Sequence, residues 1–401
     1  MAGLEQQRLF REARASTRAD SASMPRRSTV GIAYRFLPHY RVGFFSALHT
    51  ALHGDGIDLE LSYGVPPGSD ATPDPELSWA RPVRNRVIAM GSSSPLVWQQ
   101  IPRAVRKADL VVLMQESKVL SNFPVIARGV AGLSRVALWG HGLNFEQEHG
   151  SLSNRFKLSY SRRVHWWFAY TKGVADVLVA AGFPASRITV VENSIDTESL
   201  RHAACRPQSD PTPDLRAQMG TRGGPTAIFC GRLYERKRVD FLLEASRRIR
   251  ERIADFELII IGDGPDAVKV RTFAAANPWT HYVGAHFDED IIPYFKCAQL
   301  CLMPGAVGLT LLDAFALETP LVTTSLPDHG PEIEYLRPEE NGIVTENSLD
   351  AYVEGTVRVL SSRELLNRLR TGCRESAEHY TLENMVSNFR GGVHAALEVP
   401  R

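Results

Sequence analysis

Short apolar runs recur along the chain in two series, and an amphipathic or polar stretch of helical length separates most runs from the next. Runs of this length, bounded by turn residues, are typical of buried strands. Strands that alternate with helices predict βαβ units and parallel sheets covered on both faces, so we expect an α/β fold. The runs of the first series are Thr29–Ala33, Leu59–Tyr63, Asp109–Met114, Arg135–Trp139, Trp166–Tyr170 and Ile188–Val191; those of the second are Ala227–Cys230, Leu258–Ile261, Thr280–Val283, Leu300–Met303 and Leu321–Thr324.

A polar stretch from His202 to Pro225 interrupts this alternation and predicts a linker, because it is rich in proline, glycine, serine and aspartate. Two Rossmann-like domains in tandem follow, over residues 29–201 and 226–379. A deep cleft between them is the expected ligand site. Residues 1–28 hold six arginines and little aliphatic content. They indicate a flexible extension, with a basic membrane tether or a true start at Met24 as alternatives.

The composition excludes several functional classes. There are 46 basic and 45 acidic residues, so no overall field would attract nucleic acid. The five cysteines lack metal-ligand spacing, which favours buried thiols in a reducing cytoplasm over a metal site. The sequence has no apolar run of spanning length and no apolar core of a secretory signal at its amino terminus, so we expect a soluble cytoplasmic protein.

The segment from Gly231 to Asp240, GRLYERKRVD, directly follows an apolar run and precedes an amphipathic helix. Arg232 and Lys237 would therefore lie at the end of a strand, where an open α/β sheet binds its ligand. Two cations there suit a diphosphate. Taken alone, the segment could equally be a solvated basic turn.

Four further segments accompany it: LPHYRVGFFSAL at residues 37–48, WGHG at 139–142, LIIIGDGP at 258–265 and PGAVGLTLLDAFALETP at 304–320. Together with GRLYERK, they resemble the retaining nucleotide-sugar glycosyltransferases of GT-B fold, specifically glycosyltransferase family 4. The resemblance runs from about residue 28 to residue 400 and is more specific in the carboxy-terminal half. It implies that residues 380–401 form helices that cross back to the first domain.

The resemblance assigns donor-binding roles to several positions. Arg232 and Lys237 match the pair that holds the donor diphosphate, where fixed cations stabilise the charge that grows on the leaving phosphate. The backbone N–H groups at the start of the helix after Pro304 would also face the diphosphate. The positions expected to bind the donor are Gly43, Gly231, Gly262, Gly264, Gly305, Val307, Gly308, Leu309, Thr310 and Asp313.

The sequence departs from the family pattern at three positions. Two glutamates eight positions apart are usual, and they fall here at Gly305 and Asp313. The second survives as a shorter carboxylate that could reach the ribose hydroxyls, or that could serve as a first-turn acid favoured by the helix dipole. The first is gone, so recognition of the donor sugar is in doubt. Glu318 occupies a helix end where glycine is usual, which predicts a strained left-handed conformation.

The amino-terminal half supplies further candidates. His141 follows a strand and is flanked by glycines, and it matches the family's cleft histidine near the donor sugar; a structural histidine is the alternative. His39 and Arg41 would contact the acceptor or form a surface turn. The segment Asn154–Trp167 interleaves basic and aromatic residues, which the resemblance links to peripheral contact with the inner membrane face, although a helix packed inward explains it as well.

Asp288, Glu289 and Asp290 resemble a DxD metal motif, but the apolar segment that follows favours an acidic helix start. We therefore expect no metal, no cofactor other than a UDP-sugar or GDP-sugar co-substrate, and no nucleic-acid partner. The resemblance predicts a retaining hexosyltransferase that acts on a glycan, lipid-linked or small-molecule acceptor in cell-surface polysaccharide or glycoconjugate synthesis. An epimerase or phosphorylase of GT-B fold, or a degenerate nucleotide-sugar-binding subunit, are the alternatives.

Overall fold

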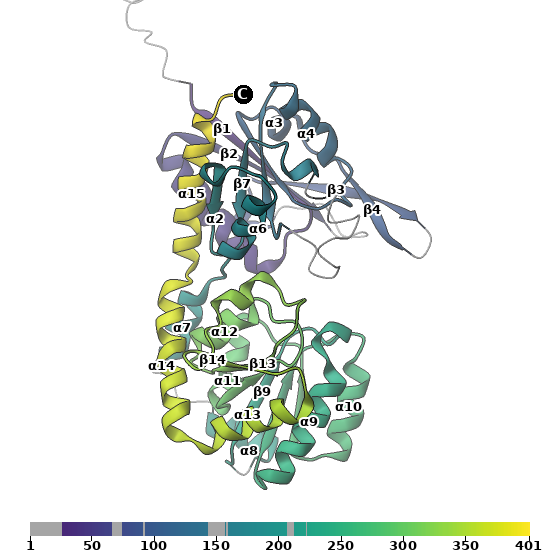
Figure 1. The fold of residues 1–401 in the computed structure, drawn as a ribbon, viewed down its shortest axis with the longest axis vertical. Coiled ribbons are helices and arrows are strands. Elements are labelled where there is room, and N and C mark those ends of the chain that lie inside the picture. The colour runs from purple at the N-terminus through teal and green to yellow at the C-terminus, as the bar shows by residue number, and fades with distance from the viewer. Residues whose placement is uncertain are drawn as a thin grey trace, which may run out of the picture.

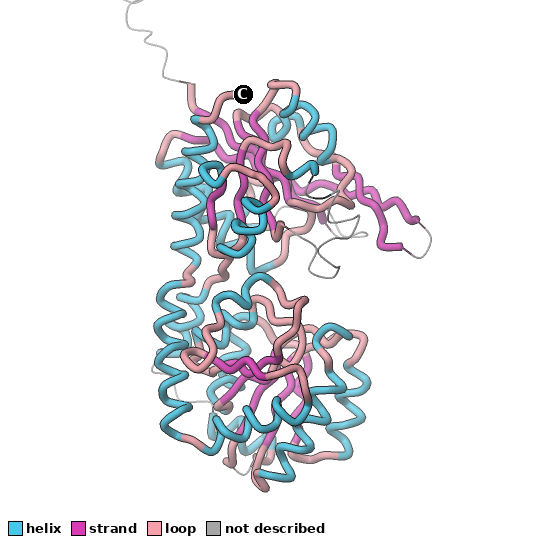
Figure 2. The backbone as a smooth tube through the Cα atoms, in the orientation of Figure 1, coloured by secondary structure: helices cyan, strands magenta, loops and turns pink. Residues whose placement is uncertain are grey.

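The computed structural model describes residues 26–65, 74–90, 93–142, 157, 159–206, 212–221 and 223–401, and the expected extension lies almost wholly outside them. Two α/β domains follow one another along the chain (Figure 1). Each domain contains a sheet flanked by helices, as the backbone trace shows (Figure 2). The predicted α/β class with two parallel-sheet domains is confirmed.

The amino-terminal sheet has eight strands in the order β4-β3-β2-β1-β5-β6-β7-β8. Neighbouring strands run parallel except β3 and β4, which form an antiparallel hairpin that the sequence analysis did not anticipate. In the register, Val30 of β1 aligns with Leu59 of β2 and Leu110 of β5. The strands are β1 (Ser28–Tyr34), β2 (Ile57–Val65), β3 (Arg81–Met90), β4 (Ser93–Gln99), β5 (Leu110–Met114), β6 (Arg135–Gly140), β7 (Trp166–Ala169) and β8 (Ile188–Val190).

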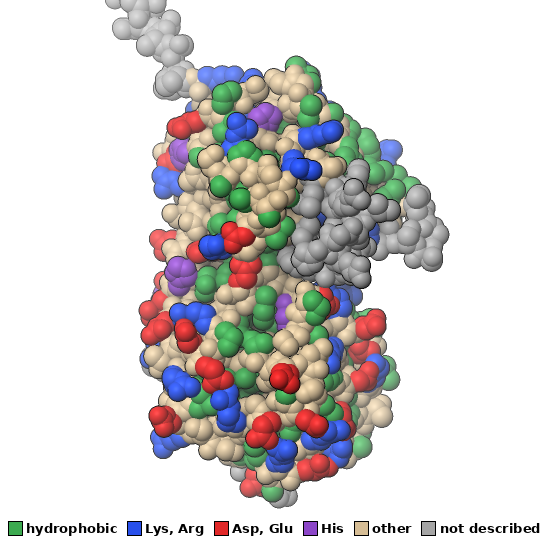
Figure 3. All heavy atoms as spheres, in the orientation of Figure 1, with side chains coloured by type: hydrophobic (Ala, Val, Ile, Leu, Met, Phe, Trp, Pro, Cys, Tyr) green, Lys and Arg blue, Asp and Glu red, His purple; other side chains and the backbone are tan. Residues whose placement is uncertain are grey.

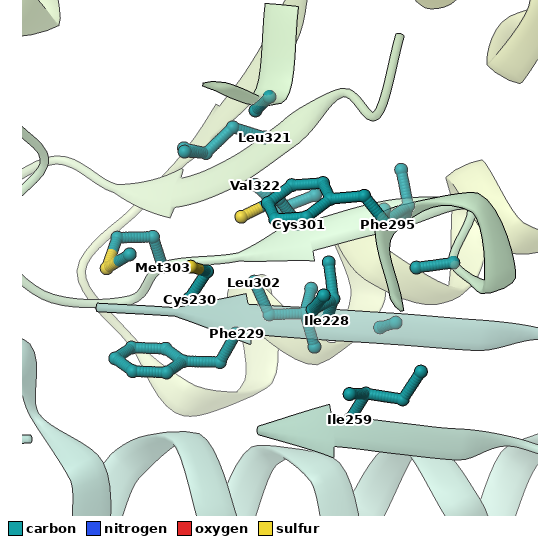
Figure 4. Packing of buried hydrophobic residues seen from close by; sticks show 14 of the residues in the cluster. Ile228, Phe229, Cys230, Ile259, Phe295, Cys301, Leu302, Met303, Leu321 and Val322 are labelled. Atoms are coloured by element: carbon teal, nitrogen blue, oxygen red, sulfur yellow. The ribbon is translucent and has the colours of Figure 1, made fainter. Parts of the chain in front are cut away.

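The carboxy-terminal sheet has six parallel strands in the order β11-β10-β9-β12-β13-β14. They are β9 (Thr226–Cys230), β10 (Glu257–Ile261), β11 (Thr280–Gly284), β12 (Leu300–Leu302), β13 (Leu321–Thr324) and β14 (Gly342–Thr345). Figure 4 shows Ile228, Ile259 and Leu302 packed within this sheet, and all three are fully buried. Because helices cover both faces, the central strands carry continuous apolar runs, Ala227–Cys230, Leu258–Ile261 and Leu300–Leu302, instead of alternating with polar residues.

The helices of the amino-terminal half are η1 (His39–Arg41), α2 (Val42–Gly54), η2 (Pro75–Leu77), α3 (Arg103–Arg106), α4 (Asn122–Val130), α6 (Lys172–Ala180) and η3 (Ala185–Arg187). Those that follow are α7 (Thr197–Cys205), α8 (Thr212–Met219), η4 (Glu235–Lys237), α9 (Val239–Arg252), α10 (Ala267–Ala276), η5 (Asp288–Ile291), α11 (Ile292–Cys297), α12 (Thr310–Ala316), η6 (Pro331–Tyr335), α13 (Leu349–Ser361), α14 (Arg363–His379) and α15 (Leu382–Glu398).

The last helix, α15, returns to the amino-terminal domain and packs against α2 (Figure 1). Its apolar stripe, which includes Met385, Phe389 and Val393, is fully buried in that domain's core. The ring of Phe389 stacks on that of Phe168 with centroids 4.0 Å apart. The chain therefore crosses between the domains twice, once before α7 and once between α14 and α15.

The range 202–225 differs from the linker that its composition predicts. It contains the end of α7 and the whole of α8, and residues 207–211 and 222 lie outside the described part. Asp196 caps α7 by accepting a hydrogen bond from the N–H of Ser199. Arg216 of α8 donates to the carbonyl of Cys297 at 3.1 Å. Tertiary contacts thus make helices of a stretch whose proline and glycine content indicated a loop.

Candidate functional site

The carboxyl ends of β9 and β10 form a pair of glycine turns in close contact. Gly231 and Gly262 have φ values of 153° and 141°, and Gly264 has a φ of 153°. A Cβ atom on Gly262 would lie 1.9 Å from the carbonyl oxygen of Gly231, and one on Gly264 would lie 2.2 Å from that of Leu233. These glycines are therefore required by the packing of one turn against the other, whatever ligand the turns face.

Lys237 is buried directly beside the first turn. A Cβ atom on Gly231 would lie 3.8 Å from Cε of Lys237 and 3.9 Å from Oγ1 of Thr310, so these three residues are neighbours. The Lys237 Nζ donates to the carbonyl of Ala306 at 2.5 Å. Burial lowers the pKa of Lys237 to about 8, although nearby Cys301 opposes the shift. The ammonium is thus still charged near neutral pH and is held toward the loop that follows β12.

Arg232 lies next to Gly231, and its side chain is exposed. Among the described residues Arg232 has no ion-pair partner, whereas the other two arginines of this segment bind neighbouring groups. Arg236 lies near Asp328 and donates to its carbonyl, and Arg238 donates to Asn347. Arg232 is therefore the arginine of this segment that remains available for an anionic ligand.

The loop after β12 explains the missing glutamate. A Cβ atom on Gly305 would lie 2.3 Å from the carbonyl oxygen of Arg236 and 2.6 Å from Cα of Lys237. No side chain fits there unless the backbone of one segment moves. Val307 is buried, and its N–H donates to Nδ1 of His329 at 3.0 Å. The loop is thus fixed against the segment that carries Lys237, and position 305 offers contact through its backbone alone.

Helix α12 starts at Thr310, with Leu309 as the N-cap and open space around Gly308. The N–H groups of a first helical turn have no intrahelical partner, so they can bind an anion that approaches over Gly308. Asp313 lies in this short helix and is partly exposed. Burial, together with the charge of Asp288, raises the pKa of Asp313 to about 7. Its carboxyl group is therefore half protonated near neutral pH.

His141 follows β6 in the amino-terminal domain and is exposed, with its ring 4.4 Å from the ring of Tyr170. Desolvation by the surrounding protein lowers the pKa of His141 to about 4, and the charges of Lys157 and Arg41 contribute. The imidazole is therefore neutral at physiological pH. Gly142 has a φ of 74°, which favours glycine at this turn.

His39 lies in η1, and Gly43 lies at the start of α2, which follows directly. His39 is exposed, and its Nε2 lies 3.9 Å from Asp288 of the carboxy-terminal domain, with its ring 5.3 Å from that of Phe287. Gly43 lies in the first turn of α2, where a Cβ would meet only Leu382 at 3.5 Å. His39 is thus at the junction of the two domains, on the side where their sheet ends meet.

Arg41 is buried, whereas both the acceptor contact and the surface turn considered from the sequence would leave it exposed. Its side chain is 1% exposed, and its guanidinium donates to the carbonyl of Ser194 at 3.0 Å and to the side-chain oxygen of Asn193. It also lies over the ring of Trp139 at 5.5 Å. The aromatic side chains that follow Arg41 draw this turn into the core, so Arg41 packs against the segment that joins the domains.

A buried hydrogen-bond network crosses the domain junction, and the sequence analysis did not predict it. Asn193 accepts from Arg41 and donates to the Glu332 carboxylate at 2.6 Å, and both Asn193 and Glu332 are almost fully buried. Burial raises the pKa of Glu332. A Cβ on Gly330 would lie 2.8 Å from both Oε2 of Glu332 and the carbonyl of Val307. The only signal in the sequence is the alternation of glutamates with apolar residues in Pro331–Tyr335, which is also typical of an exposed turn.

The basic, aromatic segment at 154–167 lies partly outside the described residues. Within the described part, Lys157, Tyr160, Trp166 and Trp167 are buried, and Arg162 and Arg163 are the exposed basic residues. The described aromatic side chains fill the core, as the inward-packing alternative predicts.

The acidic run at 288–290 belongs to η5, which leads into α11. Glu289 forms an ion pair with Arg206 at 3.0 Å, and Asp288 faces His39. No group of three or more potential metal ligands occurs among the described residues. The run therefore acts as a helix start, and its charges contact basic residues of other elements.

The left-handed conformation expected at Glu318 is confirmed, since its φ is 50°. Arg374 of α14 donates to both carboxylate oxygens of Glu318, at 2.9 and 2.6 Å. The bidentate pair offsets part of the backbone strain. Glu318 therefore connects α12 to α14 and lies apart from the candidate site.

Residues 224–362 match the family model described as glycosyl transferases group 1. The chain is 24% identical over 199 residues to a GDP-mannose-dependent phosphatidylinositol monomannoside mannosyltransferase of Mycobacterium tuberculosis, covering 45% of this chain and 49% of that protein. It is 21% identical over 239 residues to the alpha-monoglucosyldiacylglycerol synthase of Acholeplasma laidlawii, covering 58% of each. The chain thus spans about half the length of the curated relatives it matches.

The fold resembles that of Anabaena HepE in complex with UDP, with a TM-score of 0.66 at 12% identity, over 92% of this chain and 99% of that one. The GT-B resemblance inferred from the sequence is confirmed for the fold, and the family model confirms it for the carboxy-terminal domain. No helix among the described residues is long and apolar enough to span a bilayer.

Proposed function

We infer, from a GT-B fold whose carboxy-terminal domain matches the group 1 glycosyl transferases, that this chain transfers a sugar from a nucleoside diphosphate to an acceptor. The observation that carries the proposal is the arrangement of Lys237 and Arg232 around the turn at Gly231. One cation is buried and fixed, and the other is exposed and unpaired within the described residues. Lys237 lies beside the start of α12, and Arg232 directly follows the turn at Gly231, so we propose that all three supply positive potential to the same ligand.

In this mechanism, the bond between the anomeric carbon and the diphosphate oxygen breaks, and negative charge grows on the departing phosphate. Lys237 stabilises that charge without having to reorient, because the protein already holds its ammonium in place, and Arg232 adds a second positive charge. We propose that these cations act in place of a metal ion. Asp313 would hydrogen-bond the ribose hydroxyls through its partly protonated carboxyl group.

On the amino-terminal side, His141 would lie beside the sugar as oxocarbenium character develops. A neutral imidazole at that position avoids repulsion with a developing cation and can accept or donate one hydrogen bond. We propose that the acceptor hydroxyl attacks from the face that the diphosphate leaves and that the departing phosphate takes its proton. This route retains the configuration of the anomeric carbon.

We propose a lipid-linked or glycan acceptor and a UDP-sugar or GDP-sugar donor in cell-surface glycoconjugate synthesis. Support comes from two relatives, named a phosphatidylinositol monomannoside mannosyltransferase and an alpha-monoglucosyldiacylglycerol synthase, and from a structural neighbour with bound UDP. We propose a cytoplasmic location, where nucleotide sugars would be available to the site.

The test is a panel of UDP- and GDP-sugars screened by thermal stabilisation, in which a donor at about a hundred times its dissociation constant adds roughly 2.7 kcal/mol. Product analysis with the donor that stabilises the chain then follows, with and without acceptor. Transfer only in the presence of acceptor, with retained configuration, supports the proposal. Interconversion of the sugar without acceptor would instead identify an epimerase.

A binding subunit without turnover is the second candidate, and Gly305 favours it. The backbone contacts of Gly305 exclude the carboxylate that the family usually places there. Calorimetry with UDP and GDP that shows binding, combined with neither transfer nor donor hydrolysis, would establish this alternative.

A further inference from the structure

The β3–β4 hairpin extends beyond the sheet that carries it. Val65, the last residue of β2, aligns with Arg84 in the middle of β3, so the rest of β3 continues past the carboxyl end of β2 with β4 as its partner. Figure 1 shows the two strands projecting from the side of the amino-terminal domain. A projecting two-stranded ribbon buries little apolar surface by itself. The exposure of its apolar side chains therefore requires an explanation.

One face of the hairpin combines arginines with large apolar side chains. Arg86 is opposite Trp98, and Ile88 is opposite Leu96, so these four residues share a face with Arg84 two positions before Arg86. Ile88 is 43% exposed and Trp98 is 41% exposed. Arg84 and Arg86 are also exposed. We call Arg84, Arg86, Ile88, Leu96 and Trp98 the hairpin face.

The hairpin and the segment that follows it are basic, and the nearby Glu116 forms an ion pair with Arg35. From Arg81 to Lys107 the sequence has six basic residues and no aspartate or glutamate, although the whole chain has a net charge of only +1. Arg84 and Arg86 form no ion pair with any residue that the structure describes. The excess of positive charge is therefore local to the hairpin and the segment that follows it.

A cavity of about 390 Å³ opens beside Trp98, between β4 and α4. Arg106 and Arg128 line it together with Ile101 and Pro124, and no acidic side chain does. The buried Nε of Arg128 has no hydrogen-bond partner among the described residues. An unsatisfied buried donor is costly, so this guanidinium is suited to an anionic group entering the cavity.

We propose that the hairpin face docks on an anionic lipid surface and that the cavity receives a phosphate-bearing headgroup. An exposed tryptophan and an isoleucine among arginines suit the boundary between headgroups and acyl chains, where the apolar side chains leave water and the arginines meet phosphates. Figure 3 shows hydrophobic side chains gathered on this projection. Pairing of β4 with a second copy of the chain is disfavoured, because it would bring two basic hairpins together.

The test is co-sedimentation of the full chain with vesicles of phosphatidylcholine alone and of phosphatidylcholine mixed with phosphatidylglycerol, without donor. We expect binding to the anionic vesicles and its loss at high salt, since screening weakens the attraction. Arg84→Gln with Arg86→Gln should lower the vesicle affinity about thirtyfold, as expected for two charges at an anionic surface. Ile88→Ser with Trp98→Ser should lower it by about tenfold or more.

Two control variants carry matched changes elsewhere. Arg187→Gln with Arg363→Gln removes two exposed arginines, and Val268→Ser removes an apolar side chain that is 63% exposed; both should bind vesicles like the native chain. Arg106→Gln with Arg128→Gln tests the cavity, and competition by glycerol 3-phosphate distinguishes free phosphate binding from headgroup binding. UDP or GDP affinity should be unchanged in every variant, so failure of docking is separable from failure of the proposed activity.

Three results would each overturn the proposal. They are equal binding to neutral and anionic vesicles, absence of binding to both, and hairpin variants that bind like the native chain. Binding of a single-stranded DNA oligonucleotide that depends on Arg84 and Arg86, without vesicle binding, would also overturn it and identify a nucleic-acid surface.

Discussion

At the scale of single residues, Lys237 is the side chain whose environment bears most directly on the proposed chemistry. Replacing it by alanine removes a fixed positive charge from the place where the leaving phosphate is expected. Turnover should fall by about a hundredfold or more, as it does when one preorganised charge-stabilising group is removed elsewhere. Lys296→Ala is the control, because Lys296 is exposed on α11. Native turnover in a folded Lys237→Ala protein would rule out the assigned role.

The pKa of Lys237 predicts a pH dependence of nucleotide binding. Below about 8 the ammonium is charged and attracts the diphosphate; above it the free protein loses the proton, and binding has to restore it. The affinity for UDP or GDP should therefore fall by up to about tenfold per pH unit above this value. Lys237→Arg should flatten the profile, since a guanidinium stays protonated. Calorimetry over a pH series measures both, and an equally steep profile in the arginine variant would contradict the assignment.

At the scale of elements, α15 offers an adjacent pair of glycines in opposite environments. A Cβ on Gly392 would lie 2.5 Å from Oγ1 of Thr189 and 2.6 Å from Cε1 of Phe168, whereas nothing lies within 4 Å of one on Gly391. Gly392→Ala should lower the free energy of unfolding by about 1–3 kcal/mol through overpacking. Gly391→Ala should raise it by about 0.5–1 kcal/mol, because alanine favours the helix. Denaturant titration of the two variants measures both changes. Equal changes in the free energy of unfolding would show that α15 does not pack as described.

At the scale of the whole molecule, a buried hydrogen-bond network of three side chains joins the two domains. Its members are Arg41, Asn193 and Glu332. Asn193→Ala leaves both charged groups without the amide between them, so the free energy of unfolding should fall by about 1–3 kcal/mol. Asn367→Ala, at an exposed position on α14, should have little effect. This network extends from Arg41 in the first domain to Glu332, which lies near the loop at Val307. We therefore also expect turnover to fall more than donor affinity. A change confined to donor affinity would indicate that the network does not couple the domains.

Much of this molecule was predictable from local pattern. Apolar runs separated by amphipathic stretches determine parallel sheets covered by helices, because only burial on both faces suits strands that are apolar throughout. The segment GRLYERK directly follows an apolar run, so the sequence also predicted that Arg232 and Lys237 lie near the carboxyl end of a strand. The left-handed backbone at Glu318 also followed from the sequence, since helix ends of this kind usually require glycine.

Only the tertiary structure decided which polar side chains face the site. Arg41 has sequence neighbours typical of a surface turn, yet contacts with residues far along the chain bury it. The reason that position 305 has no side chain lies in the backbone at Arg236 and Lys237, about seventy residues earlier in the sequence. Local pattern determines the elements because backbone hydrogen bonds and burial are periodic. The fate of a polar side chain depends on partners that only the completed fold brings near, because burying it without them would cost too much free energy.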